Sequence, residues 1–239
     1  MPNRTVTDIT RGGGHARFLQ PSENRGAGVI LLPSVVGLNK ATDDILIKLA
    51  DAGLTALAWD PFTAYGPDLT REEKGRLSAS VFDDAVLQRE HSGWVDYMQR
   101  DLGVAKVGVI GFCMGGRMSL VLAAADARLS ASVAFYPSIR DPKPAKAGDV
   151  IALAANIACP VQIHYPGQDY VTSNASFAQL RAALESRPGV APTTVFYYPQ
   201  ARHGFFGKTR EESPADATAG AIAWPATVAF LRAALLDAA

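Results

Sequence analysis

The chain has 239 residues, of which 23 are lysine or arginine and 23 are aspartate or glutamate, so its formal net charge is zero. Hydrophobic residues make up 48% of the sequence, and this content together with the low net charge argues against intrinsic disorder. Balanced charge also argues against nucleic-acid and anionic-membrane partners, because both require a basic surface. We therefore expect one folded domain over residues 1–239.

The sequence shows no predicted targeting or membrane segment. Residues 1–14 are polar and lack the apolar core of a signal peptide. No window approaches the roughly 20 uncharged apolar residues of a membrane span. The two cysteines, Cys113 and Cys159, are too few for a disulfide framework or a cysteine-based metal site. These features favour a cytoplasmic protein.

The predicted strands begin with an antiparallel hairpin, residues 5–9 and 15–19, whose turn contains the glycines at 12–14. Short apolar runs predict further strands at 28–32, 55–59, 104–112, 131–136, 161–165 and 193–198. Several of these runs are nearly continuously apolar. That pattern is typical of parallel strands covered on both faces.

Predicted helices alternate with these strands, at residues 41–52, 81–100, 114–125, 174–185 and 219–237. The alternation predicts an α/β fold, with a mostly parallel sheet and helices on both faces. Functional residues of such a sheet lie at the carboxyl ends of its strands. The last helix is expected to pack on the sheet, although its apolar stripe would also suit a dimer, so both monomer and homodimer remain open.

The segment 111–116, Gly-Phe-Cys-Met-Gly-Gly, joins a buried-looking strand to a predicted helix. Its Gly-x-Cys-x-Gly spacing is that of a nucleophile elbow with sulfur in place of the usual hydroxyl. A sharp strand-to-helix turn requires small neighbours on both sides, and it places the sulfur of Cys113 near a helix N-terminus, where the dipole favours a thiolate. The alternative is an ordinary buried cysteine.

A thiol nucleophile needs a base, and the sequence has four histidines. His15 lies in the predicted hairpin. His91 is among charged residues in the middle of a helix, where we expect a solvated side chain, and His164 lies inside a strand, where it could be a core residue. His203 follows the last predicted strand after the short loop 199–202, the place of the base in this topology.

The acid of such a site should leave the strand that precedes the histidine's strand. Asp169 follows the strand at 161–165 after Pro-Gly-Gln. There its carboxylate would accept the Nδ1 proton of His203 and hold the ring in one orientation. A turn or helix-capping role is the alternative, but the order Cys113, Asp169, His203 on three strand exits favours the catalytic one.

With these motifs the sequence resembles the dienelactone hydrolase family, which has the α/β-hydrolase fold. The resemblance covers most of the chain and rests on residues 33–39, 60–62, 111–116, 167–169 and 203–205. It implies a Cys113, Asp169 and His203 triad, and an oxyanion hole made by the backbone N–H groups of Val35 and Met114. It implies no metal and no organic cofactor.

Two departures from the family pattern concern the substrate. Dienelactone-hydrolysing members carry a glutamate at the position of Ser34 and an arginine shortly after the catalytic histidine. Here the latter segment reads His-Gly-Phe-Phe-Gly-Lys at 203–208, so only Lys208 or Arg76 could substitute for that arginine. The expected activity is therefore hydrolysis of a small-molecule ester or lactone through a thioester, rather than of dienelactone in particular.

Three alternatives remain from the sequence. The chain could be a thioesterase or a general carboxylesterase on the same scaffold. It could be a redox-sensing protein in which Cys113 reacts with peroxide, although Cys159 is predicted at the opposite end of the sheet. It could also be a binding domain without activity, although all three triad residues are present in order.

Overall fold

The computed structural model describes residues 5–207 and 211–237. At its centre is an eight-stranded sheet in the order β1-β2-β4-β3-β5-β6-β7-β8. The strands are β1 (Thr7–Arg11), β2 (Gly14–Leu19), β3 (Ala27–Leu32), β4 (Thr55–Trp59), β5 (Lys106–Phe112), β6 (Leu129–Phe135), β7 (Val161–Gln168) and β8 (Thr193–Arg202). Strand β2 pairs antiparallel with β1 and β4, and β4, β3, β5, β6, β7 and β8 run parallel. The predicted α/β fold with an N-terminal hairpin is confirmed.

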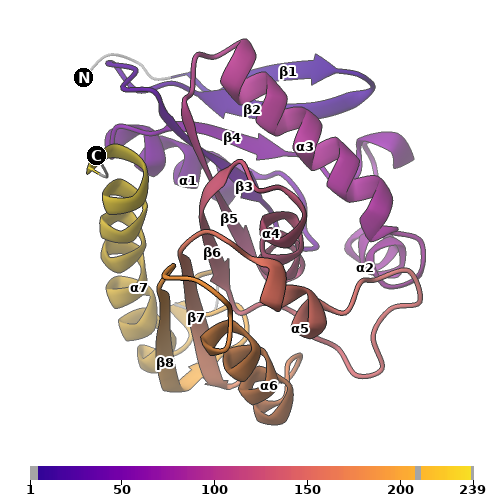
Figure 1. The fold of residues 1–239 in the computed structure, drawn as a ribbon. Helices are drawn as coiled ribbons and strands as arrows, with labels where there is room; N and C mark the ends of the chain where they lie inside the picture. The colour runs from indigo at the N-terminus through magenta and orange to yellow at the C-terminus, as the bar shows by residue number, and fades with distance from the viewer. Residues whose placement is uncertain (1–4, 208–210, 238–239) are drawn as a thin grey trace.

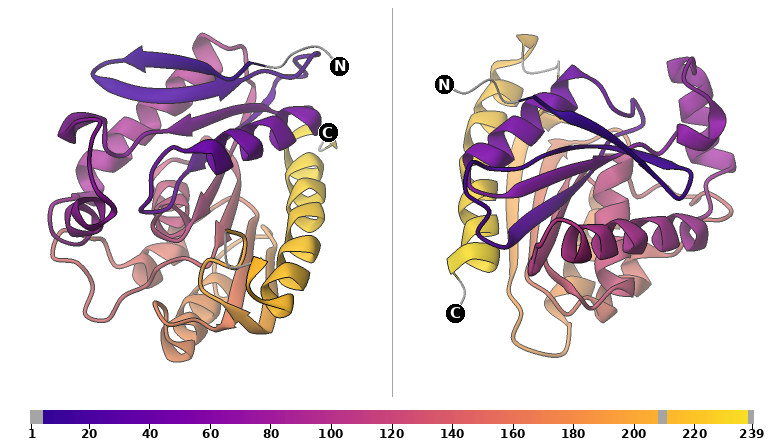
Figure 2. Two further views of the ribbon diagram at one scale, coloured as in Figure 1. Left: turned by 180° about the vertical axis from the view of Figure 1, so that it is seen from behind. Right: turned by 90° about the horizontal axis from the view of Figure 1, so that it is seen from above.

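Helices cover both faces of the sheet (Figures 1 and 2). Helices α1 (Lys40–Asp51) and α7 (Pro214–Arg232) lie on one face, and α3 (Asp84–Arg100), α4 (Met114–Ala125) and α6 (Asn174–Glu185) lie on the other. Two short helices, α2 (Arg71–Ser80) and α5 (Val150–Leu153), and the turns η1 (Thr63–Tyr65), η2 (Ala154–Asn156) and η4 (Ala233–Asp237) complete the described chain. Each face has its own hydrophobic core.

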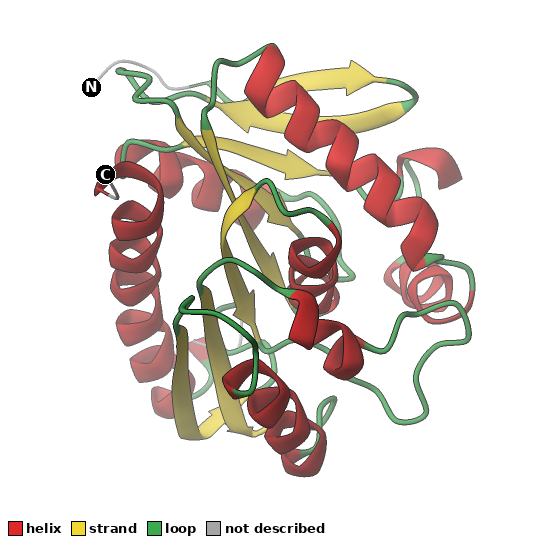
Figure 3. Ribbon diagram, viewed as in Figure 1, coloured by secondary structure: helices red, strands yellow, loops and turns green. Residues whose placement is uncertain are grey.

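The hairpin turns over two residues, which is tighter than the predicted loop. Gly12 and Gly13 have φ of +59° and +82°, and Arg11 pairs directly with Gly14. Two successive residues with positive φ match the right-handed twist of a hairpin, and glycine adopts that conformation without strain. Strand β2 runs antiparallel to β4, so its first residues lie beside the last residues of β4. The hairpin turn therefore lies on the side of the sheet where the parallel strands have their carboxyl ends (Figure 3).

The single helix predicted over residues 81–100 is wrong at its start. Helix α3 begins at Asp84, and residues 71–80 form a separate helix, α2, that was not predicted; the buried Phe82 lies between the two. Helix α2 begins with a capping box between Thr70 and Glu73, and α3 begins where the Asp83 carboxylate accepts the N–H of Ala85. The cap at Asp83 therefore sets the start of α3, three residues after the predicted start.

The predicted strand ends also shift, and two of the shifts concern the candidate site. Strand β5 starts at Lys106 rather than at 104, β7 continues to Gln168 and β8 continues to Arg202. The residues 199–202 that were expected to form a loop are therefore part of the sheet. As a result, Asp169 and His203 each come directly after the last residue of a strand.

Helix α7 begins five residues earlier than predicted and packs along the sheet. Its inward side buries Ala219, Ala223 and Leu231, and Pro225 lies on the exposed side. Residues 214–237 have the length and composition of a membrane-crossing helix, contrary to the sequence expectation. A third of the most apolar window of this helix is buried inside the protein. The predicted packing of this helix on the sheet is confirmed.

Candidate active site

Cys113 occupies a strained turn between β5 and α4. Its φ is +56°, which is unfavourable for any residue other than glycine and is typical of functional turns. A Cβ atom at Gly111 would overlap the carbonyl of Gly115, and one at Gly115 would overlap the carbonyl of Leu32. The predicted need for glycine on both sides of the cysteine therefore has a direct steric cause.

The backbone around this turn is held from both directions. The N–H of Cys113 donates to the carbonyl of Phe135 at 3.0 Å, and its carbonyl accepts the N–H of Ser138 at 3.1 Å. Between these two partners, Tyr136 adopts a φ of +36°. Cys113 and Tyr136 are the two non-glycine residues with positive φ in the described ranges, so the backbone strain of this part of the chain is concentrated around the sulfur.

Asp169 is a buried carboxylate with a fixed orientation. Its side chain is fully buried, and its Oδ1 accepts the N–H groups of Val171 at 2.7 Å and Thr172 at 2.9 Å. The Thr172 hydroxyl in turn donates to the carbonyl of Pro137 at 2.7 Å. The loop after β7 therefore aims this carboxylate and ties it to the segment that follows β6.

His203 lies directly against this carboxylate. Its Nδ1 is 2.9 Å from Oδ2 and 3.0 Å from Oδ1 of Asp169. Burial lowers the pKa of His203, but interactions with Asp169 and then with Cys113 outweigh burial and raise the pKa to about 9. Nε2 makes no hydrogen bond within the described residues. The Cys113 side chain is nevertheless close enough to contribute to the raised pKa of the ring.

The structure therefore brings the three predicted triad residues together at the exits of β5, β7 and β8. Two further residues support them and have no sequence motif. The Tyr136 ring packs edge-on against His203, with ring centroids 5.1 Å apart. The buried Asp216 accepts the backbone N–H of Arg202 at 2.8 Å and its Nε at 3.0 Å, and so it anchors the residue that precedes His203. Tyr136 and Asp216 can be identified only from these contacts in the folded chain, because no sequence motif marks them.

The two predicted oxyanion donors belong to two different turns, one after β5 and one after β3. Met114 is the first residue of α4, so its N–H has no carbonyl partner four residues earlier within the helix. Val35 lies in a turn closed by a 2.9 Å bond from the N–H of Gly37 to the carbonyl of Ser34. Because a trans peptide points its C=O and N–H in opposite directions, this bond directs the N–H of Val35 out of the turn.

The remaining histidines lie outside this cluster. The expected solvated position of His91 is wrong: the ring is 2% exposed, packs edge-on against Trp59, and burial lowers its pKa to about 3. The two α3 residues before it, Arg89 and Glu90, are charged, but His91 lies on the stripe of the helix that faces the sheet. His164 is a hydrogen-bonded core residue, as predicted, and His15 pairs with Asp8 in the hairpin.

Cys159 is separated from Cys113 by the length of the sheet. It precedes the first residue of β7, whereas Cys113 follows the last residue of β5, and these strands are parallel. Burial raises the pKa of Cys159 to about 11, so its thiol stays protonated. Within residues 5–207 and 211–237, no three His, Cys, Asp or Glu side chains are grouped as metal ligands.

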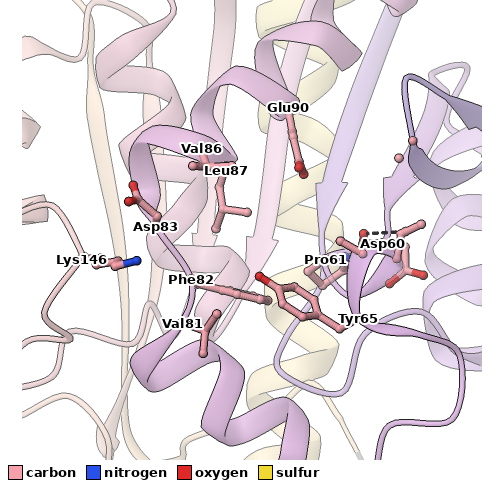
Figure 4. Close-up of a pocket in the computed structure, with 14 residues that line it drawn as sticks. Asp60, Pro61, Tyr65, Val81, Phe82, Asp83, Val86, Leu87, Glu90 and Lys146 are labelled. Carbon is pink, nitrogen blue, oxygen red and sulfur yellow. Dashed lines mark hydrogen bonds between the residues drawn. The ribbon is translucent and has the colours of Figure 1, made fainter.

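A cavity of about 270 Å³ lies between the segment that follows β4 and the start of α3, with none of the triad residues in its wall. Its wall includes Tyr65, Phe82, Glu90 and Lys146 (Figure 4). Phe82 also contacts Phe62, with ring centroids 5.5 Å apart. A pair of aromatic rings therefore separates this cavity from the turn that contains Val35.

Known proteins resemble this chain over most of its length. The model of the "Dienelactone hydrolase family" matches residues 15–235. A Bradyrhizobium protein named "Probable 2-oxo-3-(5-oxofuran-2-ylidene)propanoate lactonase" is 28% identical over 85% of this chain and 82% of its own length, and a Rhodococcus opacus carboxymethylenebutenolidase is 26% identical over 92% and 87%. A crystal structure of a "Putative Dienelactone Hydrolase" from Klebsiella pneumoniae subsp. pneumoniae aligns with a TM-score of 0.80, at 21% identity over 95% of this chain and 97% of that one. The chain belongs to the dienelactone hydrolase family.

Proposed function

We propose that this chain, a hydrolase of ester or lactone bonds by its family, cleaves its substrate with Cys113 as the nucleophile and through a thioester intermediate. His203 is the proton carrier. Asp169 holds its imidazole in one orientation and favours the protonated ring. The N–H groups of Met114 and Val35 bind the oxyanion. The single observation that carries this proposal is the buried contact between Asp169 and His203. The pKa of this histidine is also raised by Cys113.

The raised pKa of His203 suits this role because it favours an imidazolium beside a sulfur anion. A thiolate is the reactive form of cysteine, and an imidazolium is the acid that a departing alkoxide needs. Asp169 does not have to accept a proton, since its charge stabilises the imidazolium where it stands. The sulfur also lies at the N-terminus of α4, where the helix dipole favours negative charge.

The reaction would proceed in two halves. Sulfur attacks the acyl carbon, a C–S bond forms, and the carbonyl electrons move to the oxygen held by the two backbone donors. The tetrahedral adduct then breaks its C–O bond, and His203 gives its proton to the leaving alcohol. Water attacks the thioester with His203 as the base, the C–S bond breaks, and the acid leaves with Cys113 restored.

The choice of nucleophile restricts the substrate. A thiolate is a better leaving group than an alkoxide, so a tetrahedral adduct with a poor leaving group collapses back to the thiolate. Aryl esters, enol esters and strained lactones are therefore the favoured substrates. Ser34 cannot provide the carboxylate found in dienelactone-hydrolysing members, Arg76 is exposed on α2, and Lys208 lies outside the described residues. We therefore place the substrate among activated esters and lactones generally.

The test is a panel of p-nitrophenyl esters, acyl thioesters and lactones, assayed with the wild type and Cys113→Ala in parallel. We expect activity on aryl esters or lactones and a loss of at least about 10⁴-fold in the variant. Preferred turnover of thioesters would instead assign a thioesterase. Unchanged ester hydrolysis by Cys113→Ala would refute the proposed nucleophile.

A further inference from the structure

The turn that holds the proposed oxyanion donor Val35 has a cationic side chain at its other end. Lys74, on α2, donates from Nζ to the carbonyl of Val36 at 3.2 Å. The same ammonium lies 5.3 Å from the ring centroid of Phe62, within the range of a cation–π contact. Two contacts from one flexible side chain hold its charge against this turn.

Two peptide groups connect this ammonium to Val35. The carbonyl of Val36 and the N–H of Gly37 belong to one peptide, and that N–H donates to the carbonyl of Ser34 at 2.9 Å. The carbonyl of Ser34 and the N–H of Val35 belong to the next peptide. The hydrogen-bonded chain therefore begins at Lys74, passes through both peptides and ends at the N–H proposed to bind the oxyanion.

Such a chain acts on both the direction and the strength of its last donor. Each trans peptide points its N–H opposite to its C=O, so fixing the two carbonyls fixes the direction of the Val35 N–H. Hydrogen bonds in series also polarise one another, and a cation at the start withdraws electron density along the whole chain. The last N–H thereby becomes a stronger donor to developing negative charge.

The rest of the turn is built to keep this path. Gly37 has a φ of +72°, and a Cβ atom there would come within 3.1 Å of the Phe62 ring, so glycine lets the turn close against Phe62. Asn39 donates to the carbonyl of Gly37 at 3.3 Å while its side-chain oxygen caps α1. The exposed helix α2 buries no residue of its own, and Lys74 links it to this turn.

We propose that Lys74 is a positioning residue that orients and polarises the Val35 N–H, an inference that rests on the proposed oxyanion role of Val35. It acts through the carbonyl of Val36 rather than by touching the substrate. The effect should therefore appear in the transition state, where the oxyanion forms, and be weak in substrate binding.

The test compares Lys74→Met, which keeps the length and the packing on Phe62 but has no donor, with Lys74→Arg, which keeps both charge and donor. Lys40→Met is the matched control, because Lys40 is exposed and pairs with Asp44. With p-nitrophenyl acetate, which carries no carboxylate, we expect kcat to fall about three- to tenfold in Lys74→Met while KM stays within about twofold. Lys74→Arg and Lys40→Met should stay within about twofold of the wild type.

A transition-state mimic provides a second readout. An alkyl trifluoromethyl ketone would add to Cys113 and place an oxyanion at the same donors. Its inhibition constant should rise in Lys74→Met by the factor that kcat/KM falls. Lys74→Gln, also without charge, should repeat both losses and serves if Lys74→Met does not fold.

The outcomes separate this inference from the proposed function. If Cys113→Ala is inactive and Lys74→Met has the kcat and inhibition constant of the wild type, only the role of Lys74 is wrong. The inference would also be overturned if kcat fell equally in Lys74→Met and Lys74→Arg. The same holds if kcat fell as much in Lys40→Met as in Lys74→Met. Full activity in Cys113→Ala would remove the proposed function and this inference together.

Discussion

His203 and His91 are both buried histidines with a buried carboxylate nearby, but at neutral pH the first favours its protonated form and the second its neutral form. His203 is 6% exposed and its pKa is raised to about 9, whereas His91 is 2% exposed and its pKa is lowered to about 3. Burial acts in the same direction on both rings, because it disfavours the charged form. The difference therefore comes from what each carboxylate is bonded to.

Asp169 directs its carboxylate at the Nδ1 of His203 at 2.9 Å. Asp84, the carboxylate that acts on His91, is bonded elsewhere: its two oxygens accept Nη1 and Nη2 of Arg117 at 2.6 and 2.7 Å, and Oδ2 also accepts the N–H of Gly148. It acts on His91 only through its charge, which raises the pKa of the ring by less than burial lowers it. One buried carboxylate thus orients the proposed proton carrier, and the other joins structural elements.

Removing the charge of Asp169 should have the largest effect on activity. Asp169→Asn keeps the shape of the side chain but no longer holds the imidazole as a charged donor, so we expect kcat to fall about 10³- to 10⁴-fold. Steady-state hydrolysis of an aryl ester measures this loss. A decrease below tenfold would mean that Asp169 is only a turn residue.

The equivalent change near His91 should act on stability. Asp84→Asn leaves the buried Arg117 guanidinium without its counter-charge, which costs about 3–5 kcal/mol in the free energy of unfolding. Urea denaturation measures this cost, and kcat per folded molecule should stay within about threefold of the wild type. A large drop in kcat with unchanged stability would contradict the distinction between the two carboxylates.

The pH dependence of the wild type sharpens the comparison further. As pH rises through about 9, His203 loses its proton, so the sulfur loses its counter-charge and the leaving group loses its acid. We expect kcat/KM to decline on the alkaline side near pH 9. Asp169→Asn removes a cause that raises this pKa, so its decline should move to lower pH. An identical alkaline limb in both proteins would be inconsistent with the proposed pairing.

The smallest effect is expected at His91 itself. Its Nε2 is buried without a hydrogen-bond partner among the described residues, so replacing the ring by an apolar side chain removes an unsatisfied buried polar atom. His91→Leu should change the free energy of unfolding by less than about 1.5 kcal/mol and leave kcat unchanged. Thermal denaturation and an ester assay test both parts, and lost activity in a stable variant would assign His91 a role in the reaction.

Much of the candidate site could be predicted because its local sequence is demanding. The turn at Cys113 requires glycine at 111 and 115, and strand exits restrict where Asp169 and His203 can lie. His91 was misplaced because the charged residues just before it in sequence, Arg89 and Glu90, are typical of a solvated surface. Its spacing from Leu87 and Trp94, which share the buried stripe, is the signal that would have placed it correctly.

Other features depend on contacts that no local pattern reveals. The extension of β8 to Arg202 depends on its pairing with Gln168. Asp216 and Tyr136 support His203 from segments distant in sequence. Such residues carry no motif, since their types are common and only the folded chain brings them to the site.

The most direct measurement of the proposed chemistry is the location of the acyl group during turnover. Wild-type protein is mixed with p-nitrophenyl acetate, quenched in acid within the first turnovers, digested and examined by mass spectrometry. We predict one acetyl group, on the peptide that contains Cys113, and its disappearance as hydrolysis is allowed to finish. Acetyl on Ser34 or His203 instead, or full turnover with no acetylated peptide at any time, would contradict a cysteine nucleophile.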